Sequence, residues 1–215
     1  MTKEMTAGVL HGVRDLRVKK VPVPEIDNDE VLVKIEANGI CGSDIHFFEK
    51  GKLGPFTVDK PYIPGHESSG VIVKTGIGVD SLNKGDRVVI EPGIPCRRCQ
   101  LCKKGKYNLC ENVTFLSAPP VNGTFCEYIS VPADFVYKIP DNMSFGEGAM
   151  VEPTVVGVHA CNRAEVTAGM SVTILGTGPI GLLTLQAARA FGATEIIAVD
   201  IVNSRLKLAG DLGAN

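Results

Sequence analysis

The chain has 215 residues, enough for one large domain, or for one domain and part of a second. Its 22 Lys and Arg residues nearly balance 24 Asp and Glu residues, which argues against a nucleic-acid-binding or anionic-membrane-binding surface. No run of 18 apolar residues is present, and the first residues lack the apolar stretch of a signal peptide, so we expect a soluble cytoplasmic protein without a membrane span.

Short strands dominate the chain as far as about Ile139. β-branched runs between Gly, Pro and Asn residues predict strands at Glu30–Ile35, Ser69–Lys74 and Asp86–Ile90. Val21–Pro24 has to be an edge or a linker, because proline has no N–H to donate to a strand partner. We therefore predict a strand-rich domain over residues 1–150.

The pattern changes after Pro140, where helices alternate with apolar strands. A capping box formed by Ser144 and Glu147 begins the first predicted helix. Helices are predicted at Ser144–Met150, Thr154–Arg163, from the glycine-rich turn to about Phe191, and at Asn203–Leu212, with strands at Ser171–Leu175 and Glu195–Val199. This β-α-β-α order is the start of a doubly wound parallel sheet, so residues 151–215 are predicted to be the first part of a nucleotide-binding domain.

Two strands are few for such a sheet, which needs several strands and cover on both faces. We therefore expect the chain to stop within its second domain and to have little or no catalytic activity by itself.

Four of the seven cysteines form a cluster. In a reducing compartment, clustered thiols indicate metal binding before disulfides. The ligands would be Cys96, Cys99, Cys102 and Cys110. Two consecutive Cys-x2-Cys turns supply three thiolates, and Cys110 supplies the fourth later in the same loop, which favours a closed structural zinc site. An iron–sulfur cluster is the alternative, but in ferredoxins the fourth cysteine comes sooner and precedes proline. The separate Cys126 and Cys161 are interpreted as buried small apolar residues.

A second candidate metal site combines Cys41 with His66 and Glu67, 25 positions further along the chain. All three side chains are competent zinc ligands, and three protein ligands with one water make a catalytic site. From these residues alone, a core cysteine and an ordinary surface or core histidine remain alternatives.

A glycine-rich turn follows the strand at Ser171–Leu175 and opens a helix, which is the context that dinucleotide binding requires. Gly176 would permit the tight turn, Gly178 the approach of a pyrophosphate, and Gly181 the packing of helix on strand. Asp200 ends the next strand, where a carboxylate accepts from a ribose 2′-hydroxyl and repels a 2′-phosphate. NAD is therefore predicted over NADP, although the nearby Arg205 could accept a 2′-phosphate.

These segments resemble the medium-chain zinc alcohol dehydrogenases over the whole chain, and within them the sorbitol (polyol) dehydrogenase branch. The stretches that carry the resemblance are Gly39–His46, Gly65–Glu67, Glu91–Cys99, Ser117–Pro120, Gly123–Tyr128, Val151–Pro153, Val156–Ala160 and the glycine-rich turn. The resemblance implies an α/β protein with a GroES-like β-rich catalytic domain followed by a partial Rossmann domain.

The resemblance also implies roles for individual residues. Cys41, His66 and Glu67 would bind the catalytic zinc, while Glu152 would contact its water or substrate or exchange with Glu67 as ligand. Ser43 would touch the alcohol and pass its proton toward His46. Ile180 and Arg205 would line the cofactor. Phe47 and Ala118 stand where the branch often has a tyrosine and a threonine, which leaves the particular polyol open.

The expected function is therefore that of a zinc-dependent oxidoreductase with one catalytic and one structural zinc ion. It would transfer a hydride from a secondary alcohol of a sorbitol- or xylitol-like polyol to NAD and form a ketose. A threonine or butanediol dehydrogenase of the same family, or a non-catalytic zinc-binding fragment, is the alternative. A homo-oligomer is expected at full length, with no nucleic-acid or membrane partner.

Overall fold

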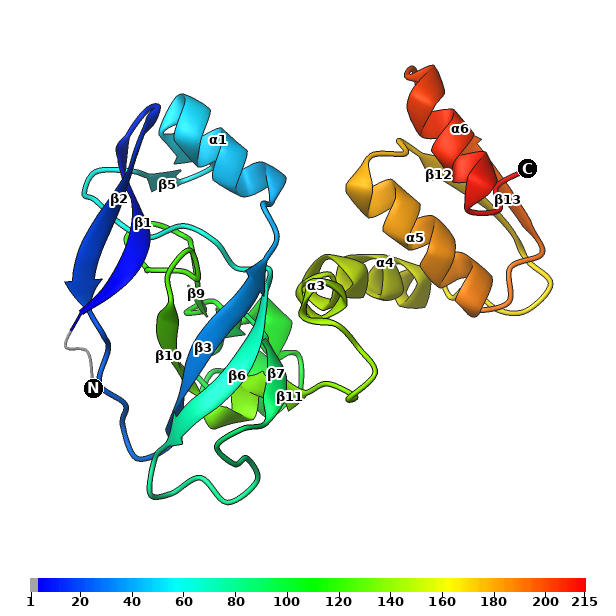
Figure 1. The fold of residues 1–215 in the computed structure, drawn as a ribbon. Helices are drawn as coiled ribbons and strands as arrows, with labels where there is room; N and C mark the ends of the chain where they lie inside the picture. Colours follow the sequence, from blue (N-terminus) through cyan, green and yellow to red (C-terminus); the bar gives the residue numbers. More distant parts are fainter. Residues whose placement is uncertain (1–3) are drawn as a thin grey trace. The chain divides into compact units, whose positions relative to one another are not determined.

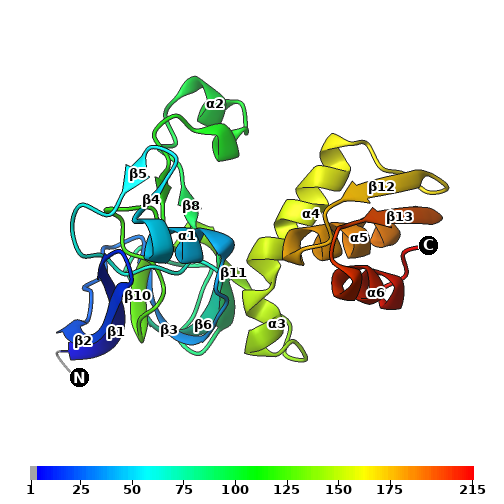
Figure 2. The same cartoon turned by 90° about the horizontal axis from the view of Figure 1, so that it is seen from above.

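The computed structural model describes residues 4–215, which form two compact units, the first ending at Met150 and the second running over Val151–Asn215. Each unit has its own buried core (Figures 1 and 2). None of the helices in the described residues is long and apolar enough to cross a membrane.

A five-stranded antiparallel sheet is the centre of the first unit (Figure 1). Its strands, in spatial order, are β10 (Tyr128–Pro132), β3 (Glu30–Asn38), β6 (Ser68–Thr75), β7 (Arg87–Ile90) and β11 (Val136–Lys138). Alternate residues of these strands point into one apolar cluster, in which Val31, Val33, Ile72, Val88 and Val131 have no exposed surface. The predicted strands near 30, 69 and 86 are thus confirmed as β3, β6 and β7.

A hairpin of β1 (Glu4–Gly12) and β2 (Asp15–Pro22) precedes this sheet and was not predicted. β2 exposes most of its residues, including the apolar Leu16 and Val18, so it has no buried face. β1 is held to the rest of the unit through Leu10, which bonds to Tyr62 in both directions. Proline ends β2, in agreement with the interpretation of Val21–Pro24 as an edge or linker.

Short elements connect these strands. The two-residue strands are β4 (Lys52–Leu53), β5 (Phe56–Thr57), β8 (Gly93–Ile94) and β9 (Thr114–Phe115). The helices are α1 (Gly42–Lys50), α2 (Gln100–Lys103), η1 (Tyr107–Leu109), η2 (Ala133–Phe135) and α3 (Phe145–Ala149). The predicted capping box is confirmed at α3: Ser144 Oγ accepts from the Glu147 N–H, and the Glu147 carboxylate accepts from the Ser144 N–H.

The second unit has the predicted β-α-β-α order after an initial helix. It comprises α4 (Val151–Arg163), β12 (Ser171–Leu175), α5 (Pro179–Ala190), β13 (Glu195–Val199) and α6 (Asn203–Asp211). α4 begins three residues before the predicted Thr154, because Pro153 lies in the first turn, where a helix needs no N–H. The strands pair in parallel, from Ser171 with Glu195 to Leu175 with Val199.

The parallel pair is covered on one face only. Leu185, Ala188, Ile196 and Ala209 form the buried core between the sheet and its helices. On the opposite face, Leu175, Ile197 and Val199 are 81%, 43% and 46% exposed. Parallel sheets are ordinarily covered on both faces, so this unit has the architecture expected for the first part of a doubly wound domain.

Candidate metal sites and nucleotide turn

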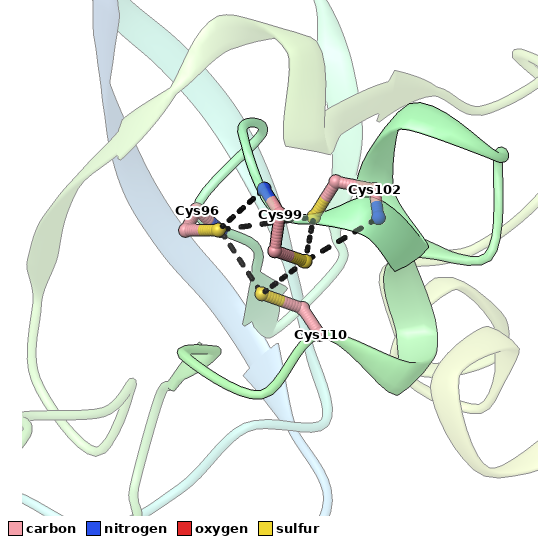
Figure 3. Close-up of side chains that lie close together, drawn as sticks. All are labelled: Cys96, Cys99, Cys102 and Cys110. Atoms are coloured by element: carbon pink, nitrogen blue, oxygen red, sulfur yellow. Dashed lines mark hydrogen bonds between the residues drawn. The ribbon is translucent and has the colours of Figure 1, made fainter.

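The four predicted cysteines lie together in a loop between β8 and β9 that projects from the first unit (Figure 2). Figure 3 shows their sulfur atoms facing one another, with separations of 3.4 Å for Cys99–Cys102, 3.9 Å for Cys99–Cys110 and 4.0 Å for Cys96–Cys102. Four thiolates about 2.3 Å from one zinc ion would lie ~3.8 Å apart in a tetrahedron. The cluster therefore fits a closed tetrahedral zinc site.

Backbone N–H groups of the same loop point at these sulfur atoms. The Cys96 N–H lies 3.3 Å from Cys110 Sγ, and the N–H groups of Cys99 and Cys102 lie 3.4 Å from the preceding ligand's Sγ. Donation from backbone N–H groups, with Arg98 first, lowers the pKa of Cys96 to about 6 and also lowers the pKa of Cys99. Desolvation instead raises the pKa of Cys102 to about 12. The loop thus favours the thiolate form of two ligands before any metal charge acts.

Arg97, a basic residue of this loop, interacts with residues outside the cysteine cluster. Arg97 lies 2.7 Å from Asp134, and its guanidinium stacks 5.7 Å from the centre of the Phe135 ring. Tyr107 packs edge-on against the same ring and donates to Glu91. Arg97 and Tyr107 therefore hold the four-cysteine loop to the body of the unit, a role that the sequence did not reveal.

The second candidate site is assembled by the pairing of β3 with β6. Cys41 follows β3, and His66 and Glu67 precede β6, whose Ser68 is paired with Asn38. The pairing brings the ligand atoms of Cys41, His66 and Glu67 to within 4.8 Å of one another. His66 and Glu67 are buried, while Cys41 is half-buried. The structure thus brings together the three residues that the sequence analysis grouped.

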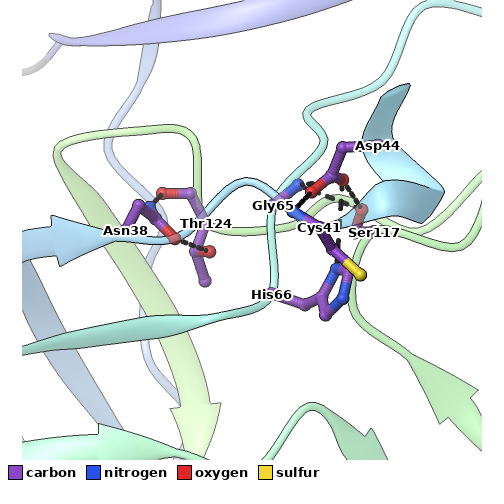
Figure 4. Close-up of polar contacts among 7 residues, drawn as sticks. All are labelled: Asn38, Cys41, Asp44, Gly65, His66, Ser117 and Thr124. Carbon is purple, nitrogen blue, oxygen red and sulfur yellow. Dashed lines mark hydrogen bonds and ion pairs between the residues drawn. The ribbon is translucent and has the colours of Figure 1, made fainter. Parts of the chain in front are cut away.

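Asp44 organises this site and was missed by the sequence analysis (Figure 4). Its buried carboxylate accepts hydrogen bonds from the N–H groups of Cys41 (3.0 Å) and Gly65 (3.1 Å) and from the hydroxyl of Ser117 (2.9 Å). His66 Nδ1 lies 3.9 Å from the same carboxylate. Asp44 is the third residue of α1 and forms a capping box with Cys41. A carboxylate three positions after Cys41 could therefore have been recognised in the sequence as part of a helix N-terminus.

A second polar pair fixes the neighbouring loop. The Asn38 side-chain amide donates to the Thr124 carbonyl, and Thr124 Oγ1 donates to Asn38 Oδ1 at 2.8 Å (Figure 4). The Thr124 N–H in turn donates to the Gly65 carbonyl. The segment that leads into His66 is therefore held by Asp44 on one side and by Thr124 on the other.

The donor set fits a divalent cation. His66 Nδ1 is buried without a hydrogen-bond partner, and its only ionic neighbour in the described residues is Asp44. Glu67 is also buried, with 8% of its surface exposed. Desolvation raises the pKa of the Cys41 thiol, which a cation would reverse. A buried polar atom without a partner is costly, and Cys, His and Glu are ordinary zinc ligands, so a cation would satisfy His66 Nδ1.

The remaining predicted residues of this region lie on α1. Ser43 lies two positions after Cys41, where its hydroxyl and N–H oppose the desolvation that raises the pKa of the Cys41 thiol, and His46 is exposed one turn further along. No hydrogen bond joins Ser43 to His46 in the described structure. Phe47 is only 3% exposed and packs edge-on against Tyr62. Its ring therefore belongs to a local apolar core with Leu10 and Tyr62.

The glycine-rich turn has the predicted form. Gly176 adopts φ +93°, a conformation that favours glycine, and its N–H donates to the Val199 carbonyl. Gly178 is the N-cap of α5, with Pro179 in its first turn. A side chain at Gly181 would meet the Gly176 carbonyl oxygen at 1.9 Å, so this glycine lets the helix start directly over the turn.

Asp200 does more than the sequence predicted. Its carboxylate accepts from the Thr177 N–H (2.8 Å), the Thr177 hydroxyl (3.1 Å) and the Val202 N–H (2.9 Å), and it lies 3.7 Å from Arg205. Donation from the backbone of Thr177 and Val202 is the main cause that lowers the pKa of Asp200, so it stays ionised. Asp200 thus ties the end of β13 to the glycine-rich turn.

Three other predicted residues belong to the second unit. Glu152 is the second residue of α4, Ile180 lies in the first turn of α5 with 42% of its surface exposed, and Arg205 lies on α6. The two lone cysteines differ. Cys161 is buried as expected, whereas Cys126 is half-buried and donates to the Tyr128 carbonyl.

Comparison with known proteins identifies relatives along the whole chain. The sequence profile of the family described as "Alcohol dehydrogenase GroES-like domain" matches residues 27–141. A sorbitol dehydrogenase of Bombyx mori is 51% identical over 212 residues, 99% of this chain and 61% of that protein. A sorbitol dehydrogenase of Bacillus subtilis is 47% identical, with 99% of this chain and 60% of that protein covered.

Solved structures agree with these sequences. An oxidoreductase/dehydrogenase of unknown specificity from Escherichia coli superimposes with a TM-score of 0.94 at 43% identity, covering 99% of this chain and 62% of that one. Galactitol-1-phosphate dehydrogenase from Escherichia coli gives a TM-score of 0.91 at 39% identity, covering 98% and 60%. The chain therefore spans about 60% of the length of the relatives that it matches.

The profile match covers more than half of the chain, and it contains both cysteine-bearing metal clusters. The expected β-rich domain followed by the beginning of a Rossmann unit is confirmed in the fold and in its relatives. The chain therefore belongs to the zinc-dependent medium-chain alcohol dehydrogenase family, in its sorbitol dehydrogenase branch.

Proposed function

We propose that the chain forms the zinc-binding and dinucleotide-turn parts of an NAD-linked dehydrogenase that oxidises a secondary alcohol of a polyol to a ketose. The observation that carries the proposal is the cluster of Cys41, His66 and Glu67, whose ligand atoms lie within 4.8 Å of one another and include the buried, unpartnered Nδ1 of His66. The names of the relatives support the substrate class, because they include sorbitol dehydrogenases and D-xylulose reductases.

Zinc bound by Cys41, His66 and Glu67 would supply Lewis-acid chemistry, which lowers the pKa of a coordinated alcohol. Asp44 fixes the backbone of Cys41 and the approach to His66, so these ligands are held before the metal binds. The Cys-His-Glu set leaves a fourth tetrahedral position, which suits a catalytic site rather than a structural one.

Ser43 and His46 are proposed to carry the proton of the alcohol away. The Ser43 hydroxyl lies beside the Cys41 sulfur, so it is close to where the alcohol oxygen would be bound. The exposed imidazole of His46 can exchange a proton with water, one helical turn away. Glu152 is proposed to contact the water or the substrate, or to replace Glu67 as ligand.

The second unit is proposed to bind the adenosine and pyrophosphate part of NAD. The first-turn N–H groups of α5 face the place where a pyrophosphate would lie, next to Gly178. Asp200 stays ionised and accepts three hydrogen bonds within the protein. The two oxygens of a carboxylate offer about four acceptor sites, so Asp200 can also accept a hydrogen bond from a ribose hydroxyl. Its charge disfavours a 2′-phosphate, and Ile180 and Arg205 complete the proposed contacts.

The proposal extends to the compartment and to assembly. Both metal clusters need reduced thiols, which favours the cytoplasm. We also propose that the full-length protein is a homo-oligomer.

Steady-state kinetics of the full-length protein tests this function. With sorbitol and xylitol, we expect oxidation that depends on zinc and has a higher kcat/KM with NAD than with NADP. L-threonine and 2,3-butanediol are the comparison substrates, since a 2R,3R-butanediol dehydrogenase from Bacillus subtilis is a structural relative with a TM-score of 0.88 at 37% identity. Higher kcat/KM on either of these than on both polyols would reject the polyol assignment, and preference for NADP would reject the role of Asp200.

A further inference from the structure

Gly39 lies directly against the carboxylate of Glu67. It follows β3, and its N–H donates to the Glu67 carbonyl at 2.7 Å, so the two residues are fixed across from each other. A Cβ built on Gly39 would lie 2.0 Å from Glu67 Oε2, 3.0 Å from Glu67 Cβ and 3.1 Å from Glu67 Cδ. The space that a side chain at position 39 would fill is therefore already taken by the side chain of Glu67.

We propose that Gly39 is a positioning residue that admits the Glu67 carboxylate to the metal cluster with Cys41 and His66. The side chain of Glu67 runs over the bare Cα of Gly39 and reaches a point within 4.8 Å of the other two ligand atoms. Any larger residue at position 39 would push the carboxylate out of this place. The inference rests on the proposed zinc site and adds the reason why Glu67 can be its third ligand.

The glycine is not explained by its backbone. Gly39 does not have a positive φ, in contrast to Gly65 at φ +93°, so an L-residue could adopt its conformation. Nor does its missing side chain serve strand packing, as it does at Gly70, where a Cβ would meet the Lys34 carbonyl oxygen at 2.1 Å. At Gly39 the closest atom is the end of a flexible side chain, which can move while the fold stays intact.

A double-mutant cycle on zinc affinity tests the proposal. The purified chain would be titrated with zinc against a chromophoric chelator, for Gly39→Ala, Glu67→Ala, the double variant and wild type, with the four-cysteine site kept loaded. Substitutions of residues that hold a metal ligand in place typically weaken metal binding about 10–100-fold. We expect such a loss for Gly39→Ala in the wild-type background. When the change is added to Glu67→Ala, the affinity should change within about twofold, because Oε2 and Cδ are gone and only the 3.0 Å contact with the Cβ of residue 67 remains, which a small shift relieves.

Gly12→Ala is the matched control, because a Cβ there would meet nothing within 4 Å and φ is not positive. It should bind zinc as wild type does. The proposal is overturned if Gly39→Ala leaves the affinity unchanged, or weakens it equally in both backgrounds, since Gly39 would then not act through Glu67. If Gly39→Ala fails to fold, recovery of folding in the Glu67→Ala background supports the clash, and continued failure overturns it.

The cycle also separates this inference from the proposed function. A weaker zinc site in Glu67→Ala, with no effect of Gly39→Ala, would reject the positioning role and keep the ligand set. An unchanged zinc affinity in Glu67→Ala would remove Glu67 from the ligand set, and both proposals would fall.

Discussion

Replacement of Cys99 by serine is expected to unfold the loop from Cys96 to Cys110 and to remove one zinc ion from the chain. Cys99 contacts the sulfur atoms of two partners, so its loss opens the tetrahedron. Structural zinc contributes about 10–16 kcal/mol to the folding of small zinc domains, and serine is a poor zinc ligand. The loss should appear as one zinc fewer by elemental analysis and as fast amide hydrogen exchange in this loop.

Cys126→Ser is the control, because Cys126 lies outside both metal clusters. It should keep the zinc content and the exchange protection of wild type. Protection of the loop in Cys99→Ser, with the zinc content unchanged, would show that the cysteines do not hold a metal.

Replacement of Asp44 by alanine is expected to destabilise the first unit by about 3 kcal/mol or more. The change leaves the Cys41 N–H and the Ser117 hydroxyl without their acceptor, while the Gly65 N–H keeps only Ser117 Oγ, and each buried unsatisfied donor costs about 1–3 kcal/mol. For a chain of this size the melting temperature should fall by roughly 6–12 °C, measured by circular dichroism or calorimetry. Zinc binding at Cys41 and His66 should weaken in parallel.

Asp80→Ala is the comparison for this variant, because Asp80 is exposed. Its melting temperature should stay within about one degree of wild type, as for most surface substitutions. If Asp44→Ala has the same melting temperature as Asp80→Ala, the buried carboxylate of Asp44 does not organise the site.

Sequence reasoning succeeded where the signal is local. The four cysteines lie within 15 consecutive residues, from 96 to 110, so their spacing alone predicts that one loop can bring them together. The capping box at Ser144 and the strand–glycine–helix order at Gly176 are equally local. These parts of the fold are fixed by a few neighbouring residues, and the structure has them as predicted.

Contacts between segments that are distant in the sequence were predicted less completely. The register of β3 on β6 places Cys41 beside His66 and Glu67, and spacing alone cannot give a register. The grouping rested on the ligand chemistry of the three side chains and was strengthened by the family resemblance. Asp44 and Ser117 are 73 positions apart, and nothing in either segment indicates the hydrogen bond between them. The contact between Gly39 and Glu67 is likewise visible only once the strands are paired.

The hairpin β1–β2 was missed although β1 has a buried face, with Ala7 and Val9 in the core. β2 exposes its apolar residues Leu16 and Val18 as well as its charged ones, and it is held by backbone pairing with β1. Sequence periodicity therefore does not by itself tell whether an alternating strand is buried, as the exposed Leu16 and Val18 of β2 show.

The zinc content of the purified chain, before and after a mild chelator, tests the central claim most directly. The account predicts two zinc ions per chain, of which the chelator removes one, because Cys41, His66 and Glu67 leave an open coordination position while the four-cysteine site is closed. The remaining ion should stay with a folded loop. A single zinc ion in the untreated chain, or iron in the four-cysteine site, would contradict the account.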